Sequence, residues 1–312
     1  MSTLHTIAAP PGVDEAVQPW AHWKLDGDWQ DSSGNGRHLT PPTAAGGVPA
    51  FFADPPAAGT SGARFDSVNV NVSTQVPPWV PPWFSPSVAD LQALVSGPQT
   101  WAAWVRPDAL PASNSITNPV QELLSWTVAS ASTHTVLGGL RWTRRATSTA
   151  TSTQPIFLTQ SPTGGSSVLG IGSFWQRVTD PMLWTPRRSE WHHVAVTLVP
   201  SGNLQGSVQL CDTRWWLNGA PARLAPGTTA ESSVGTVCGV PVFATFSPAL
   251  VSARISLGAR WSQSAGAFVG PFDGCLDDVR IYARALTERQ IRSLANGPSA
   301  RQRLALVGQA AP

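Results

Sequence analysis

The chain has 312 residues, of which 29 are Pro, 27 are Gly and only 12% are charged, a composition that excludes a largely helical protein and favours strands joined by long turns. Its formal net charge is +2, and its basic residues occur only in small clusters. The chain therefore lacks the strong positive potential that attracts nucleic acid, and no nucleic-acid partner is expected. No run of 18 apolar residues occurs, so membrane insertion is not expected either.

Tryptophan is used unusually often, with 15 Trp against one Tyr. Trp at this level indicates large apolar area that is either buried or presented to a ligand. The length allows one large β domain or two ordinary ones. Because neither an internal repeat nor a shift of composition divides the chain, we predict one domain.

The first segment, residues 1–19, is rich in proline and lacks a hydrophobic period, so we expect an extended arm. Its start has neither a basic n-region nor an apolar h-region and is therefore not a signal peptide. Residues 20–25 follow as a strand. Residues 31–36, DSSGNG, are dense in residues that form tight turns. They are either a plain turn or a Ca²⁺ loop, since Asp and Asn oxygens suit a hard cation.

Residues 41–98 are expected to be a long, mostly irregular insertion that contains one alternating strand at 63–72. Within it lies VPPWVPPWFSP, residues 76–86. Proline fixes an extended backbone and Trp offers flat apolar faces. The segment is therefore either a stiff insertion folded back on the protein or an aromatic ledge for a sugar or another subunit. The contact residues of such a ledge are Trp79, Trp83 and Phe84.

Several further strands are expected in the middle of the chain, among them 101–105, buried on both faces, and 191–196. Within the latter strand, His192 and His193 are neighbours and point to opposite faces, so they do not bind one metal ion from adjacent positions. Leu217-Asn218-Gly219 is typical of a tight hairpin turn.

The last ordered stretch, residues 268–294, begins as a strand and continues as a short helix. Thr287 and Gln290 have the spacing of a capping box, and residues 296–298, Asn-Gly-Pro, end the helix. Residues 298–312 contain a few apolar residues without a partner among themselves, and we expect a second arm.

The amino-acid sequence of this stretch resembles that of the concanavalin A-like, laminin-G-like jelly-roll domains of many bacterial and phage surface proteins. In that family the last strand reads roughly F-x-G-x-[IL]-D-[DE]-V-R-[IV]-Y-x-R-A-L, and here residues 272–286 read FDGCLDDVRIYARAL. Four more pieces occur in the family's order, at 21–40, 99–110, 190–198 and 215–222, followed by ISLGA at 255–259. The resemblance covers about residues 20–295.

The resemblance implies an all-β, two-sheet antiparallel jelly-roll sandwich over residues 20–297, with long loop insertions and one short C-terminal helix. Its expected core residues are Trp23, Trp101, Val105, Val194, Val196, Leu217, Leu257 and Ile281. In related domains a Ca²⁺ ion often joins the opening turn to the closing strand. The candidate ligands are Asp26, Asp31, Asn35 and Asp277.

Cys275 matches the position of a laminin-G cysteine that forms a disulfide with a cysteine further along the chain. No cysteine follows Cys275 here, so this family disulfide cannot form. Three reduced, mostly buried thiols are the expectation, with a Cys211–Cys238 bridge as the alternative.

No catalytic motif is present: the paired carboxylates of glycosidases, a G-x-S-x-G elbow, a P-loop and a C-x-x-C pair are all missing from the sequence. We therefore expect a non-catalytic structural or recognition module of an extracellular particle. A phage virion protein, such as a head decoration or tail-associated subunit, is the main hypothesis, with attachment to other subunits through the arms and aromatic loop. The alternative is a lectin-like domain of a surface or secreted protein that binds cell-surface carbohydrate.

Overall fold

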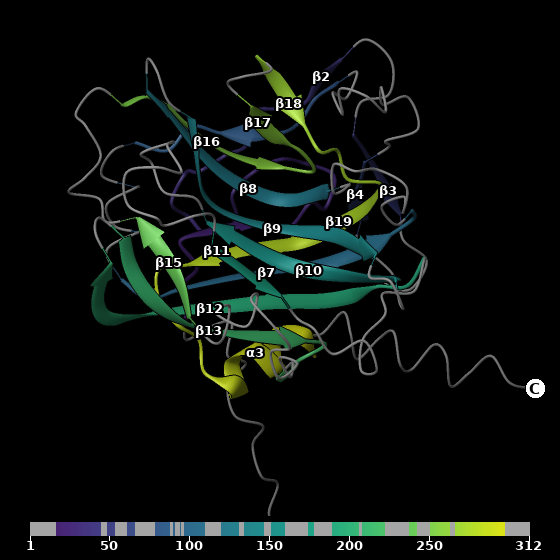
Figure 1. Ribbon diagram of the computed structural model, residues 1–312. Coiled ribbons are helices and arrows are strands. Elements are labelled where there is room, and N and C mark those ends of the chain that lie inside the picture. The colour runs from purple at the N-terminus through teal and green to yellow at the C-terminus, as the bar shows by residue number, and fades with distance from the viewer. Residues whose placement is uncertain are drawn as a thin grey trace, which may run out of the picture.

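Two antiparallel β-sheets face each other in the computed structural model (Figure 1). The structure describes residues 17–44, 49–53, 61–65, 79–87, 90, 94, 97–109, 120–130, 134–146, 151–159, 174–177, 189–205, 208–221, 237–241, 250–262 and 266–296. Sheet A has nine strands in the order β14 (Ala220–Pro221), β13 (Val208–Leu217), β12 (His192–Gln205), β7 (Gln99–Pro107), β19 (Gly274–Tyr282), β4 (Ser61–Phe65) and β3 (Ala50–Ala53), with β1 (Ala21–Trp23) on β19 and β15 (Val237–Pro241) on β13.

Sheet B has six strands in the order β11 (Phe174–Arg177), β10 (Thr151–Thr159), β9 (His134–Ala146), β8 (Val120–Ser130), β16 (Leu250–Leu257) and β6 (Trp83–Phe84). Two small pairs complete the strands: β17 (Arg260–Ser262) with β18 (Ala267–Val269), and β2 (Thr43–Ala44) with β5 (Trp79–Val80). The helix α3 (Glu288–Ala295) follows the last strand. The predicted all-β, two-sheet antiparallel sandwich with one short C-terminal helix is confirmed.

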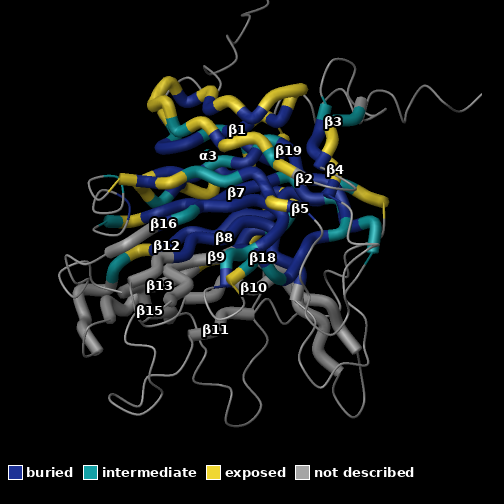
Figure 2. The backbone as a smooth tube through the Cα atoms, turned by 90° about the horizontal axis from the view of Figure 1, so that it is seen from above, coloured by how far each residue is buried: buried dark blue, intermediate teal, exposed yellow. Residues whose placement is uncertain are grey.

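The main core lies between the two sheets, where the tube is almost entirely buried (Figure 2). Trp101 from sheet A stacks on Trp126 from sheet B with ring centroids 6.2 Å apart, so this pair joins the sheets at their centre. Of the eight predicted core residues, seven are buried and Leu217 is partly buried against the same cluster. The alternation of the strands therefore predicted the inner faces correctly.

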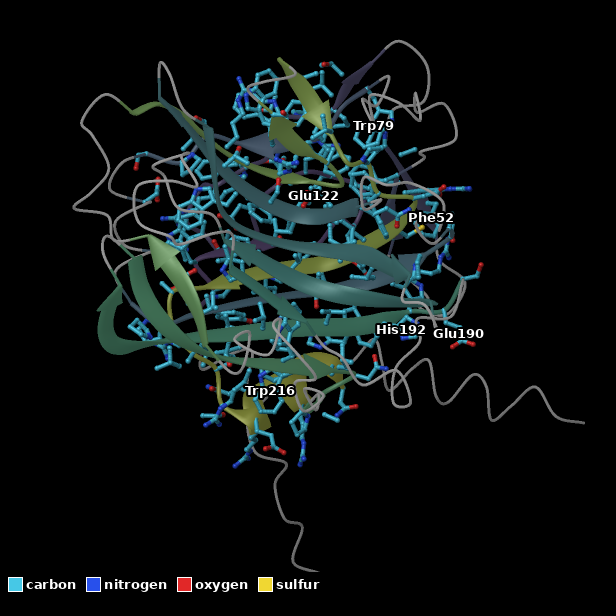
Figure 3. All side chains as sticks on the ribbon, in the orientation of Figure 1. Phe52, Trp79, Glu122, Glu190, His192 and Trp216 are labelled. Atoms are coloured by element: carbon cyan, nitrogen blue, oxygen red, sulfur yellow. The ribbon has the colours of Figure 1, made fainter. Side chains whose placement is uncertain are left out.

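A second apolar cluster lies on the outer face of sheet A, beneath α3. Trp216 from β13, labelled next to the helix in Figure 3, packs here with Ile291 and Leu294 of α3. The predicted capping box is confirmed: the Thr287 side chain accepts from the Gln290 backbone, and the Gln290 side chain accepts from the Thr287 backbone. Helix α3 thus covers part of one outer face of the sandwich.

Residues 41–98 contain more strands than the single one predicted. Five short strands lie among the described residues of this segment, of which β3 and β4 extend sheet A and β6 pairs with β16 at the end of sheet B. Two-residue strands are too short to show a hydrophobic period, which is why the sequence did not predict them. The predicted strand at 63–72 begins earlier, as β4, and its continuation lies outside the described residues.

The two predicted arms lie mostly outside the described residues, which begin at Val17 and end at Asn296. The last residues of the first arm contact the sandwich: Val17 is 5% exposed in the second cluster, and the Gln18 amide donates to the Ser33 carbonyl at 2.7 Å. In the part of the chain that is described, no helix is long and apolar enough to span a membrane.

Candidate functional site

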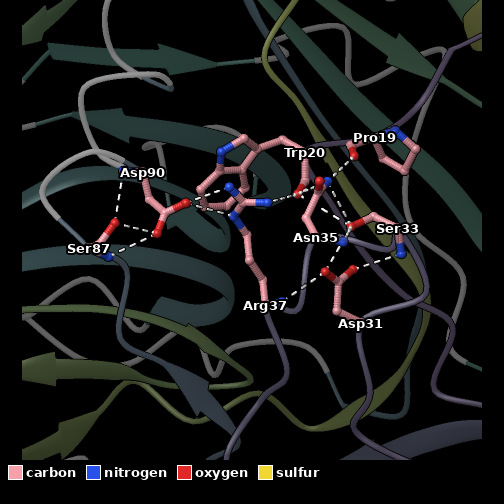
Figure 4. Close-up of polar contacts among 8 residues, drawn as sticks. All are labelled: Pro19, Trp20, Asp31, Ser33, Asn35, Arg37, Ser87 and Asp90. Carbon is pink, nitrogen blue, oxygen red and sulfur yellow. Dashed lines mark hydrogen bonds and ion pairs between the residues drawn. The ribbon is translucent and has the colours of Figure 1, made fainter.

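The opening turn after β1 is held together by the carboxylate of Asp31 (Figure 4). Its Oδ1 accepts from the backbone amides of His22 and Ser33, each at 2.9 Å, and its Oδ2 accepts from the Arg37 amide at 2.9 Å. Burial by itself raises the pKa of this carboxyl, but the three backbone donors outweigh it and hold the pKa of Asp31 below its ordinary value. Asp31 therefore organises the turn as a charged acceptor.

The same turn contacts two neighbouring segments through Asn35 and Arg37 (Figure 4). The Asn35 amide donates to the carbonyls of Pro19 and Trp20, each at 3.0 Å. Arg37 forms an ion pair with Asp90, and its guanidinium carbon lies 4.1 Å from the centre of the Trp20 ring. These contacts connect residues 17–20 and residue 90 to the turn.

Asp31 and Asn35 share this turn, but the four nominated calcium ligands do not gather around one point. Asp26 is exposed, and its Oδ1 accepts from the Ser61 amide at 3.0 Å. Asp277 is 7% exposed on β19. Within the described ranges no three His, Cys, Asp or Glu side chains come together in a way that could hold a metal ion. The contacts of Asp31 fit a backbone-organising carboxylate better than a calcium ligand, and calcium binding stays a prediction.

Removal of the Asp31 carboxylate tests its structural role. Asp31→Ala is expected to lower the free energy of unfolding by about 2 kcal/mol, because three backbone donors lose a charged, mostly buried acceptor. Asp28→Ala is the control, since Asp28 is exposed near the same turn and its Oδ1 accepts from the Gln30 amide at 2.9 Å. Urea unfolding measures both, and equal losses would contradict the role given to Asp31.

The three nominated aromatic residues have different environments. Trp79 is 3% exposed and lies in the main core, with its ring centroid 6.0 Å from that of Phe65 (Figure 3). The protein itself covers this ring, which does not favour a contact with a partner, and the contact role of Trp79 stays a prediction. The first of the two alternatives for this segment, a stiff insertion folded back on the sandwich, describes Trp79 correctly.

Trp83 and Phe84 form β6 and face opposite sides of sheet B. Phe84 lies opposite Ile255, a fully buried core residue, and meets Trp20 edge to face at 6.4 Å. Trp83 lies opposite Ser256, which alternates with Ile255 and so belongs to the outer face. Trp83 is therefore on the outer-face side of β6, where its ring is half-buried and also packs against the main core cluster.

An arginine lies among aromatic rings on this outer face. The guanidinium carbon of Arg254, on β16, is 4.1 Å from the ring centre of Trp261, 5.1 Å from that of Trp83 and 5.9 Å from that of Phe268. Burial lowers the pKa of Arg254, although an arginine remains charged, and ring faces are suitable neighbours for a partly desolvated guanidinium. We call these four residues, Trp83, Arg254, Trp261 and Phe268, the aromatic–arginine cluster. Phe268 is 6% exposed and belongs to the main core, so the half-buried members of the cluster are the two Trp rings and the arginine.

The hairpin β17–β18 supplies two of the rings and is fixed firmly to sheet B. The Trp261 and Phe268 rings meet edge to face at 5.1 Å. Next to them, Arg260 Nε donates to Glu122 Oε1 at 3.0 Å, and the Glu122 amide donates to the Gly270 carbonyl at 2.8 Å. Because Glu122 is only 1% exposed, this ion pair is protected from solvent. The cluster therefore has a rigid base.

The chemistry of the cluster is suited to binding. Half-buried indole rings can stack on a flat, partly apolar ligand face, and the guanidinium supplies hydrogen-bond donors beside them. Its carboxylate neighbour, Glu122, is already paired with Arg260. The sequence pointed to Trp83 but missed Arg254, Trp261 and Phe268. The alternation around Ile255 would have placed Arg254 on the outer face, whereas the position of the hairpin follows only from the fold.

A second polar group lies on the outer face of sheet A, at a β-bulge between Asp277 and Arg280. Asp278 there adopts φ +50°, its Oδ1 lies 2.6 Å from His22 Nε2, and Arg280 Nε donates to it at 2.9 Å. Burial by itself raises the pKa of Asp278, but the charge of Arg280 and the contact with His22 hold it well below its ordinary value. These contacts of Asp278 with His22 and Arg280 connect β1 to β19, so their role is structural.

Neither a protein-family model nor a curated protein sequence matches the chain. Solved structures with a similar fold include domain 4 of AbnA, a GH43 extracellular arabinanase from Geobacillus stearothermophilus in complex with arabinotriose, at 18% identity and TM-score 0.46 over 89% of this chain and 98% of that one. The binding domain of Paraclostridial Mosquitocidal Protein 1 matches at 14% identity and TM-score 0.45, over 86% of this chain and 49% of that one. The binding domain of botulinum neurotoxin serotype D/C matches at 10% identity and TM-score 0.47, over 89% of this chain and 52% of that one.

Proposed function

We propose that the protein is a non-catalytic, lectin-like module that binds carbohydrate outside the cell through the aromatic–arginine cluster. The observation that carries the proposal is the pair of half-buried indole rings, Trp83 and Trp261, whose centres lie 5.1 and 4.1 Å from the guanidinium carbon of Arg254. Sugar rings present flat C–H faces and rims of hydroxyl groups, so stacked aromatic rings beside a hydrogen-bond donor suit them.

The absence of catalysis is part of the proposal. Glycoside hydrolysis needs two carboxyl groups that flank one bond, with one of them able to donate a proton. Glu122 is paired with Arg260, Asp278 with Arg280, and Asp31 with backbone amides. For Asp278 and Asp31 these contacts lower the pKa and stabilise the charged form, which suits structure rather than proton transfer.

Binding is tested with a panel of oligosaccharides, arabinotriose included, by titration calorimetry on the full chain. Trp83→Ala and Trp261→Ala are each expected to weaken binding of the best ligand about 30-fold, which corresponds to about 2 kcal/mol for the loss of one central aromatic contact. The matched control is Trp191→Ala, because Trp191 is also half-buried against an arginine, Arg106, at 5.6 Å, but directly precedes β12 of sheet A.

Two results would contradict the proposal: equal weakening in all three variants, or no binding by the wild-type chain across the panel. Circular dichroism of each variant must first show the wild-type spectrum, so that lost binding is not lost folding.

Attachment to a larger assembly such as a virion, through residues 1–19 and 298–312, stays a prediction. Residues 1–16 and all of 298–312 lie outside the described residues, and the described Val17–Pro19 contact the protein's own sandwich. A binding module of this kind can function on a particle, on a cell surface or as a secreted protein. The glycan titration tests recognition in each of these settings.

A further inference from the structure

Strand β15 joins the end of sheet A at one side of the sandwich (Figure 1). It pairs antiparallel with β13 in a register that sets Leu210 opposite Gly239, Cys211 opposite Cys238 and Asp212 opposite Val237. Two of the three cysteines of the chain thus occupy one cross-strand position.

This backbone register satisfies the main geometric requirement of a disulfide. Directly opposed residues in an antiparallel pair have Cα atoms about 4.5–5.5 Å apart. Disulfides span Cα separations of about 4.4–6.8 Å. We propose that Cys211 and Cys238 form an intrachain cross-strand disulfide.

The third cysteine is not a competing partner within sheet A. Cys275 lies on β19, and β12 and β7 stand between β19 and β13. Three strand spacings amount to about 14 Å, well beyond the reach of a disulfide. The Cys275 thiol is buried and reduced, and Arg106 Nη2 donates to its sulfur at 3.0 Å.

The oxidation needs an external disulfide, such as oxidised glutathione, as the two-electron acceptor. One cysteine thiolate attacks a glutathione sulfur, forms a mixed disulfide and releases one glutathione thiolate. The second cysteine thiolate then attacks the protein-bound sulfur, forms the Cys211–Cys238 bond and releases the second glutathione thiolate. Two protein thiols lose two protons and two electrons, and one glutathione disulfide becomes two thiols.

The bond would fix β15, which pairs with β13 alone in sheet A, and close the loop of residues 211–238. A cross-link of this kind stabilises mainly by restricting the unfolded chain. Reduction is therefore expected to lower the melting temperature by about 5–10 °C.

The experiment is a peptide map of the full chain after incubation with oxidised glutathione and alkylation of free thiols in denaturant. Trypsin separates the three cysteines, since cleavage after Arg188, Arg214, Arg223, Arg254, Arg260 and Arg280 leaves each in its own peptide. The expected result is one linked pair, residues 189–214 with 224–254, and an alkylated peptide 261–280. Alkylated Cys211 and Cys238, a link to Cys275, or a link that appears only in a dimer on a non-reducing gel would each overturn the proposal.

Two cysteine variants distinguish the effect of breaking the Cys211–Cys238 bond from other effects of the reductant on the melting temperature. The double variant Cys211→Ser/Cys238→Ser is expected to melt at one temperature with and without reductant. Cys275→Ser retains both cysteines of the proposed bond and is expected to keep the shift. A shift of the same size in the double variant would show that it does not come from this bond.

Discussion

Acidification from pH 6.5 to pH 4 is expected to lower the free energy of unfolding by about 3 kcal/mol through one buried side chain, His193. Burial lowers the pKa of His193 from 6.5 to about 4, while the charge of Asp278 raises it and that of Arg280 lowers it. In the folded protein His193 therefore stays neutral down to about pH 4, whereas in the unfolded chain it binds a proton below about pH 6.5. Between these values the unfolded state holds more protons, so stability is fully present at neutral pH and is lost on acidification.

Urea unfolding at a series of pH values measures this loss in the wild type and in His193→Gln, which cannot take up the proton. The variant is expected to show a shallower decline over this pH range. His38→Gln is the control at an exposed histidine and is expected to keep the wild-type pH dependence, because His193 is intact. If the free energy of unfolding falls equally with pH in the wild type and in His193→Gln, the loss of stability in acid comes from groups other than His193.

Trp101→Ala is expected to lower the free energy of unfolding by about 3–5 kcal/mol, the usual range for removing a large aromatic side chain from a core. Trp101 is fully buried, stacks on Trp126 across the two sheets, and donates from Nε1 to Gln99 Oε1 at 3.1 Å. The substitution leaves a large cavity at the centre of the sandwich. Urea unfolding, followed by the fluorescence of the remaining tryptophans, measures the loss.

Trp83→Ala is the matched comparison, because the same chemical group is removed from the outer face of sheet B, where the ring is half-buried. It is expected to cost much less stability than Trp101→Ala while it weakens glycan binding. If the two substitutions cost the same, either the sandwich core or the outer-face position of Trp83 is described incorrectly.

The sequence predicted the fold better than the site, for reasons visible in particular residues. The closing strand and the capping box of Thr287 with Gln290 are local patterns, and both appear as expected in β19 and α3. The alternation in residues 101–105 set the inner face of β7. Such patterns depend on neighbours a few residues away, so the sequence displays them directly.

The candidate site depends instead on register between distant segments. Trp79 and Trp83 stand in identical Pro-Pro-Trp units, yet one is in the core and the other on the outer face. The difference arises because Trp83 pairs with Ser256, far along the chain. The same limit applies to Asp31. The composition of residues 31–36 allowed a calcium loop, and only the fold brings the backbone amides of His22 and Arg37 to the Asp31 carboxylate.

The position of β19 has a consequence for how the protein is made. Strand β19, the last in the described part of the chain, lies in the middle of sheet A, with β7, β4 and β1 as its partners. While the ribosome is still synthesising the polypeptide, these three strands lack the segment that joins them, so sheet A cannot close until residue 282 has left the exit tunnel. Such distant pairing makes folding slow. A nascent chain arrested before β19 is expected to be degraded rapidly by protease, and release of the completed chain is expected to bring resistance in one step.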